Sequence, residues 1–540
     1  MTTIDTHVTT APADAGAERG SAGVVAWITT TDHKRLGRMY IVASLLALLG
    51  VATVGLLLGL ERADTSTDLI DAGAVSQLFS AYRVGLTFCV LVPLLLGVAT
   101  AIVPLQVGAR SLAFPRLAAA GFYAWLIGSG IVIGAIAANG GPGGGDSRMV
   151  ALFLVAHILL LVGLLAGAAS VATTILTTRA PGMNMRRVPL FSWSALVGAL
   201  GLLLALPVLV GALVYVYIDY RYGRGGFGGN KGIMTWIGFG FTQPLTFVYA
   251  VPVFGFAAEV IAVASGRRMP LRGVVFTGIG FIGVTALSGI SQQVFSVPAN
   301  LLYGSFRAFL EVFVPYALFN LLPVLGGFIV IAVGAKALSS GRPRFTAPLV
   351  FGLTGALLVF AGMVANAVYL VGDAHLGGTV FEEGVWLSMG YGALLAALGA
   401  TAYWGPKLWG RSMPDMPLVG IALLGFVGAA LASVPLYVAG FADQPADAAS
   451  FDYSGPQDLW NWVSAAGHAL MVLTVLAFIG LALRAFTGGP SAGDDPWDAQ
   501  TLEWATSSPP PADNFAEIHT VASAEPLLDL KPLDTQRSDA

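Results

Sequence analysis

The chain has 540 residues, of which 56% are hydrophobic and only 11% are charged, and its mean hydropathy is +0.78. A soluble chain usually carries about 25% charged residues, so this composition excludes an ordinary soluble protein and predicts an integral membrane protein. The net charge of -3 says little about partners, but we expect no nucleic acid among them. Cys89 is the single cysteine, which excludes an intrachain disulfide.

Three regions follow one another along the chain. Residues 1–25 are rich in Ala, Thr, Gly and Asp and are expected to be disordered. Residues 26–487 contain twelve apolar stretches, each long enough at about 20 residues to span a bilayer. Residues 488–540 form a polar, Pro-rich tail that we expect to be soluble or loosely docked. The predicted spans are 36–60, 77–106, 114–138, 149–176, 189–218, 233–263, 272–297, 308–335, 346–371, 380–404, 415–440 and 458–486.

The charges between these spans predict the topology. Alternate loops are basic, and they include Arg186 and Arg187, Arg267 and Arg268, and Lys407 and Arg411. Two of the opposite loops are acidic, around Asp68 and around Asp447. Basic loops stay in the cytoplasm, so we expect a multi-pass protein of an inner (plasma) membrane with both termini cytoplasmic. The basic loop from Arg221 to Lys231 is the one exception.

Five stretches, distributed over the whole chain, carry a family resemblance. They are TTDHKRLGRMY (30–40), VPLQVGARSLAFPRL (103–117), TTRAPGMNMRRVPLFSWS (177–194), YWGPKLWGR (403–411) and DPWDAQTLEWATSSPPP (495–511). Together they resemble subunit I of the heme-copper terminal oxidases, the cytochrome c oxidase type. The resemblance implies an all-α membrane protein with the twelve-transmembrane-helix fold of that subunit.

The resemblance also implies two hemes and one copper, held by six histidines, because neutral imidazole suits iron and copper. None of the six histidines is present. The positions that match the heme ligands are Tyr82, Glu382 and Gly384, and those that match the copper ligands are Gln243, Gln292 and Gln293. We therefore expect no heme, no copper and no catalytic residue.

Other family features are missing as well. The positions matching the cross-linked tyrosine and the proton-donating glutamate are Phe247 and Leu245. Ser111 stands at the mouth of one family proton path, and the lysine of the other path has no counterpart in the eighth span. Of the remaining histidines, His157 and His468 each stand alone on an apolar helix, where a hydrogen-bonded packing residue is the simpler interpretation.

Three charged residues fall within the predicted spans or at their edge, namely Arg83, Glu382 and Glu383. Charge in hydrocarbon is costly, so such groups pair or line a wet cavity. We expect Arg83 to contact Glu382 or Glu383 and to close the space left by the hemes. Two alternatives are that Arg83 snorkels to the outer surface, or that the charges line a path for an ion or small solute.

These observations favour a non-catalytic relative of oxidase subunit I. It would have a structural, assembly or regulatory role in a respiratory-type complex, beside subunits that the resemblance identifies as II and III. One alternative is an active terminal oxidase that holds heme through Tyr82, Glu382 or His157, since tyrosine can ligate heme iron. A second alternative is a channel or transporter on the same scaffold.

Overall fold

The computed structural model describes residues 25–63, 69–290, 294–299, 301, 304–341, 343–446, 455–515, 517 and 520–530. Gln292, Gln293, Asp447 and the predicted disordered segment up to residue 24 lie outside the described residues. Residues 25–28 are helical and precede the first span. Most of the other described residues are helical, as the composition predicts.

Within the described residues, twelve helices are long and apolar enough to cross a membrane, which confirms the predicted number. Four of these spans are composite, because an α-helix continues through a π or 3-10 segment. The spans are α2 (His33–Ala63); α3 (Ala72–Val84), η1 (Gly85–Leu91) and α4 (Val92–Gln106); α5 (Pro115–Ala137); α6 (Ser147–Thr177); α7 (Leu190–Tyr222); α8 (Gly229–Ile237), η3 (Gly238–Gly240) and α9 (Leu245–Ser265); α10 (Arg272–Gly283) and η4 (Val284–Ile290); α11 (Phe306–Tyr316), η6 (Ala317–Leu321) and α12 (Leu322–Ser339); α13 (Ala347–Tyr369); α14 (Phe381–Trp409); α15 (Asp415–Phe441); and α16 (Pro456–Gly488).

One predicted boundary is wrong. The seventh span was expected to reach residue 297 but its helix ends at Ile290. Val297 instead pairs with the connection after α13, where its backbone N–H donates to Leu370 O and its carbonyl accepts from Gly372 N–H. Pro298 follows directly, and the residue before a proline is biased away from helical geometry.

The second, sixth and tenth spans form the centre of the bundle. In the most apolar stretch of the second and tenth spans every residue is buried, and 94% are buried in the sixth, against 28–67% in the other spans. Close approach is possible because small residues face each other, as where a Cβ added to Gly355 would meet Gly392 O at 2.6 Å. The central spans carry Tyr82, Gln243 and Glu382, so the sequence-predicted site lies inside the protein.

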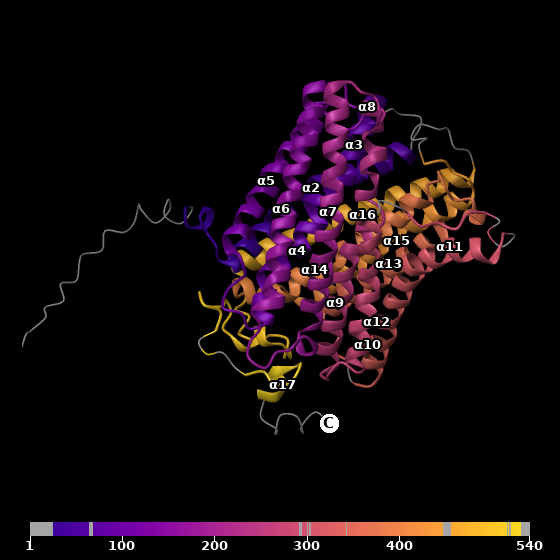
Figure 1. Cartoon of the computed structure of the whole chain (residues 1–540). Helices are drawn as coiled ribbons and strands as arrows, with labels where there is room; N and C mark the ends of the chain where they lie inside the picture. The colour runs from indigo at the N-terminus through magenta and orange to yellow at the C-terminus, as the bar shows by residue number, and fades with distance from the viewer. Residues whose placement is uncertain are drawn as a thin grey trace, which may run out of the picture.

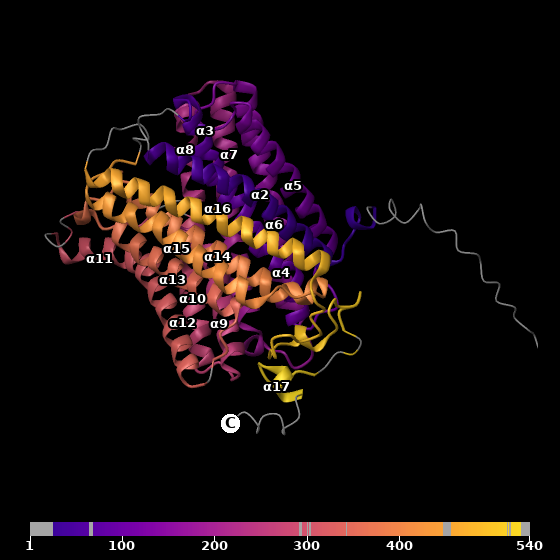
Figure 2. The same ribbon diagram turned by 180° about the vertical axis from the view of Figure 1, so that it is seen from behind.

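The remaining spans surround this centre. The last span, α16, packs against the first, α2, and the two lie side by side in Figure 2. Figure 1 shows α3 and α8 at one end of the bundle, and the C-terminal tail with the short helix α17 (Pro526–Leu530) at the opposite end.

The tail is firmly docked, contrary to the expectation of a soluble or loosely docked segment. Leu502, Glu503, Trp504 and Asn514 are all buried. The tail also meets loops that were predicted to be cytoplasmic. Arg272 pairs with Glu525 at 3.0 Å, and Arg268 with Asp529 at 2.6 Å. The polar composition misled the prediction, because acidic side chains of the tail pair with these basic loops.

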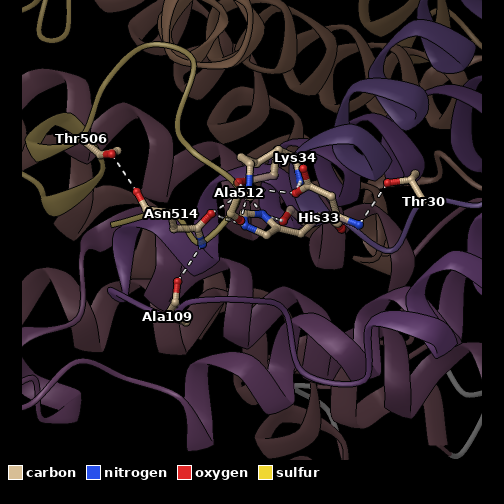
Figure 3. Close-up of polar contacts among 10 residues, drawn as sticks. Thr30, His33, Lys34, Ala109, Thr506, Ala512 and Asn514 are labelled. Atoms are coloured by element: carbon tan, nitrogen blue, oxygen red, sulfur yellow. Dashed lines mark hydrogen bonds and ion pairs between the residues drawn. The ribbon is translucent and has the colours of Figure 1, made fainter. Parts of the chain in front are cut away.

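The five stretches that carry the family resemblance converge where the tail docks. Asn514 occupies the centre of one cluster, in which its side-chain oxygen accepts from Lys34 Nζ at 2.9 Å and lies 3.0 Å from His33 Nε2 (Figure 3). The amide of Asn514 donates to Ala109 O at 2.7 Å. Nearby, Lys407 Nζ donates to Thr506 O at 2.6 Å. The tail therefore joins the beginnings and ends of several spans.

Candidate functional site

Aromatic side chains surround Tyr82, a position that the family resemblance matches to a heme ligand. Tyr82 lies on α3, and its hydroxyl is 2.7 Å from the hydroxyl of Tyr391 on α14. Tyr391 is in turn 2.7 Å from His468 Nδ1 on α16. The Tyr82 ring packs edge-on against Trp386, with centroids 5.2 Å apart. The Tyr82 oxygen is thus engaged with a protein partner rather than directed into an open space.

Gly384 offers no ligand, and its surroundings leave little room for a side chain. A Cβ added there would lie 3.0 Å from ring carbons of Tyr437 and 3.1 Å from Ser433 O. Tyr437 is fixed by its hydroxyl, which donates to Ser388 Oγ at 2.7 Å. Of the positions that the resemblance matches to heme ligands, Tyr82 is thus engaged by Tyr391 and Gly384 is crowded by Tyr437.

Amide side chains occupy the place that matches the copper. Gln243, which precedes α9, donates to Phe319 O at 2.9 Å and accepts from Asn366 Nδ2 at 3.2 Å. Asn366 on α13 also donates to Asn320 Oδ1 at 3.2 Å. Both atoms of the Gln243 amide are committed to this network, so it stabilises the bundle as a polar cross-link. Gln292 and Gln293 lie outside the described residues.

A cavity of about 320 Å³ remains between Gln243 and Glu382. Glu382 stands in the first turn of α14 and accepts a hydrogen bond at 3.0 Å from the hydroxyl of Tyr369. The structure thus brings together two positions that the sequence placed at one depth. The cavity is lined by Thr242, Gln243, Thr246, Val294, Ser296, Asn366, Tyr369, Leu370, Glu382, Val385 and Trp386.

The predicted contact of Arg83 with Glu382 or Glu383 is not formed. The guanidinium of Arg83 lies over the ring of Trp386, 4.4 Å from its centroid, and 5.0 Å from that of Phe79. It is buried, so it does not snorkel either, and within the described residues no carboxylate lies within ion-pair distance of it. A cation can be stabilised by the negative face of an aromatic ring, and this alternative was not considered from the sequence.

Glu383 pairs with Arg62 instead. Arg62 Nη2 lies 2.5 Å from Glu383 Oε2, and the two side chains are 15% and 13% exposed. The sequence carried the necessary signal, because Arg62 ends the first span in the outer layer that also holds Glu383. Because Arg62 follows the predicted span 36–60, it was expected in a loop rather than beside Glu383.

The two lone helical histidines differ from each other. His468 is a hydrogen-bonded packing residue, as predicted, through its contact with Tyr391. His157 is fully buried between Phe88 and Phe153, and neither ring nitrogen has a hydrogen-bond partner among the described residues, which contradicts the hydrogen-bonded interpretation. The structure gives no physical reason for this.

The described residues do not fit the family's cofactors. Heme iron is held by His, Cys, Met or Tyr in proteins, and Tyr82 is the one such side chain at the described matching positions, with its oxygen bonded to Tyr391. In the described part of the chain, no three His, Cys, Asp or Glu side chains gather as a metal site. No step of oxygen chemistry can therefore be derived from these residues.

A second buried polar cluster lies at the end of the bundle where the tail docks, and it was not predicted from the sequence. Gln106 Nε2 donates to Glu259 Oε1 at 2.5 Å and to Glu503 Oε1 at 3.0 Å. Burial raises the pKa of Glu503 above its ordinary value. Glu259 is the one acidic residue of an apolar span, which was a signal available in the sequence.

Comparison with known proteins agrees with the fold. Residues 35–470 match the family described as Cytochrome C and Quinol oxidase polypeptide I. The chain is 31% identical over 546 residues to the probable cytochrome c oxidase subunit 1-alpha of Streptomyces avermitilis, covering 94% of this chain and 90% of that protein. It is 30% identical over 558 residues to cytochrome c oxidase subunit 1 of Corynebacterium diphtheriae, covering 96% and 94%. A heme-copper terminal oxidase dimer solved by cryo-electron microscopy has a TM-score of 0.67 at 14% identity, over 85% of this chain and 84% of that one, which shows a shared fold.

Proposed function

Since the chain belongs to the Cytochrome C and Quinol oxidase polypeptide I family, we propose that it is a non-catalytic member that has lost oxygen reduction and proton pumping. It keeps the twelve-helix scaffold and serves a structural, assembly or regulatory role. The observation that carries this proposal concerns two positions that the resemblance matches to heme ligands: Tyr437 packs against Gly384, and Tyr391 engages Tyr82.

The stretches that resemble the family support a role in assembly. These stretches meet at the docked tail, whereas α3, which carries Tyr82, lies at the opposite end of the bundle (Figure 1). A scaffold can keep its surfaces for neighbouring subunits while its interior changes, because packing and cofactor ligation rest on different residues. The proposed partners are further membrane subunits corresponding to oxidase subunits II and III.

The proposed location is the plasma membrane, with both termini in the cytoplasm. The tail contacts Arg187, Arg268 and Arg344 in the connections between spans and Lys407 in the last turn of α14, so these residues share one side. Positive loops stay in the cytoplasm, which supports placing the tail there.

Oxygen uptake tests the proposal. Membranes in which this chain is the one subunit I-type protein should show no cyanide-sensitive oxygen consumption with reduced cytochrome c or quinol. Cyanide-sensitive uptake that is abolished by Tyr82→Ala would contradict the proposal and favour an active oxidase with unusual ligands.

A further inference from the structure

The cavity between Gln243 and Glu382 has the features of a binding site for a small ligand. Its volume of about 320 Å³ lies at the lower end of the range of about 300–1,000 Å³ for ligand pockets. Glu382 begins α14 and Tyr369 ends α13, so the cavity lies near the ends of two spans. In the proposed topology these ends face the outer water, from which a ligand could enter.

Among the described residues, the lining offers two unpaired acceptors, Glu382 Oε1 and the Asn366 side-chain oxygen, beside one buried unpaired donor, Trp386 Nε1. Tyr369 holds Glu382 Oε2, but within the described residues Glu382 Oε1 has no hydrogen-bond partner. Asn366 uses its amide N–H groups on Gln243 and Asn320, and its side-chain oxygen has no partner among the described residues. The hydroxyls of Thr246 and Ser296 are likewise unengaged by the described residues. A ligand that matches this lining donates hydrogen bonds.

The charge of the lining is negative. Among the described residues that line the cavity, Glu382 is the one charged side chain. Two arginines of this region are engaged by other side chains, because Arg83 lies on the ring of the lining residue Trp386 and Arg62 pairs with Glu383. A charged group in such an environment is stabilised by a counter-ion. Leu370, Val385 and Trp386 add an apolar wall for a short hydrocarbon part.

We propose that this cavity binds a small organic cation, a primary ammonium compound with a short apolar chain. The ammonium group donates to Glu382 Oε1 and to the Asn366 side-chain oxygen, and the hydrocarbon part lies against Val385 and Trp386. The inference rests on the proposed function, because it requires that no heme or copper occupies the same space.

Calorimetric titration of the purified full chain in nanodiscs with n-butylammonium tests the proposal, with 1-butanol as the uncharged control. We expect saturable butylammonium binding and no saturable butanol binding. Glu382→Gln should weaken binding at least tenfold, because a charge-assisted hydrogen bond is lost. Ser296→Ala should weaken it only slightly, and Glu311→Gln, which removes an exposed carboxylate outside the cavity, should leave it unchanged.

Three results would overturn the inference: no saturable binding, equal binding of butanol, or binding that Glu382→Gln does not alter. If Glu382→Gln fails to fold, competition between butylammonium and 1-butanol on the unaltered chain decides between a cation site and an apolar one. An absorption spectrum of the same sample separates this failure from that of the proposed function. A Soret band would contradict the proposed function, whereas no Soret band and no binding would contradict the inference alone.

Discussion

Glu383 shows how a charge is accommodated beside the positions that the resemblance matches to heme ligands. It pairs with Arg62 across two helices, while Arg83 rests on Trp386 without a carboxylate partner among the described residues. Removing one partner of a buried pair leaves an uncompensated charge, which costs about 3–5 kcal/mol when burial is complete. These two side chains keep some exposure, so a smaller cost is expected.

A double-mutant cycle measures this pair. Arg62→Met and Glu383→Gln should each lower the free energy of unfolding by about 1–3 kcal/mol, with a coupling of about 1 kcal/mol or more. The matched cycle of Arg83→Met with Glu383→Gln should give a smaller coupling. Denaturant unfolding in detergent supplies the values, and a larger coupling for Arg83 would contradict the assignment.

The bridging hydroxyl of Tyr391 gives a second prediction for a single residue. Tyr391→Phe removes one oxygen but leaves both Tyr82 and His468 without their partner. Leaving buried polar groups unpaired costs about 1–3 kcal/mol. Tyr437→Phe, which breaks only the bond to Ser388, is the control and should cost less. Thermal unfolding measures both losses of stability. Equal losses in the two variants would contradict a hydrogen-bonded chain through Tyr391.

The docked tail is the element whose stability depends on a few polar side chains. Asn514→Ala removes the acceptor of Lys34 and the donor to Ala109. We expect faster proteolysis and faster amide exchange of residues 495–530 than in the unaltered chain. Asp513→Ala, at the neighbouring exposed position, should not change either rate. Unchanged protection in Asn514→Ala would show that other contacts hold the tail.

Tail docking should also depend on pH through Glu503. Burial raises its pKa, so the folded chain holds this proton more tightly than the unfolded chain does. The corresponding stability is present at acid pH and is lost as the pH rises through the folded-state pKa. Amide exchange of the tail should therefore increase with pH beyond its intrinsic rate. Glu503→Gln should reduce this dependence, and the opposite trend in the unaltered chain would contradict the assignment.

At the scale of the whole molecule, labelling tests the proposed topology. A cysteine placed at exposed Asp443 should react with an impermeant reagent added from outside, and one at exposed Arg411 should not. Cys89 is buried and gives little background. The reverse pattern would overturn the orientation. Asp447, in the same predicted outer loop, lies outside the described residues.

The sequence was sufficient for the spans, because hydrophobic length is a property of each segment alone. It was also sufficient to place Gln243 and Glu382 at one depth. It could not predict that Arg83 would face Trp386, since this depends on helix rotation and on which side chains the neighbouring spans present. The prediction for the tail failed for a similar reason, because the tail's partners, such as Ala109 and Lys407, lie far away in the sequence.

Heme and metal analysis of the purified chain tests the central claim most directly. The replaced ligands and the closed positions at Tyr82 and Gly384 predict no Soret band and far less than one heme and one copper per chain. A Soret band with about one heme per chain, lost on Tyr82→Ala, would contradict this account, because tyrosine would then be ligating heme iron.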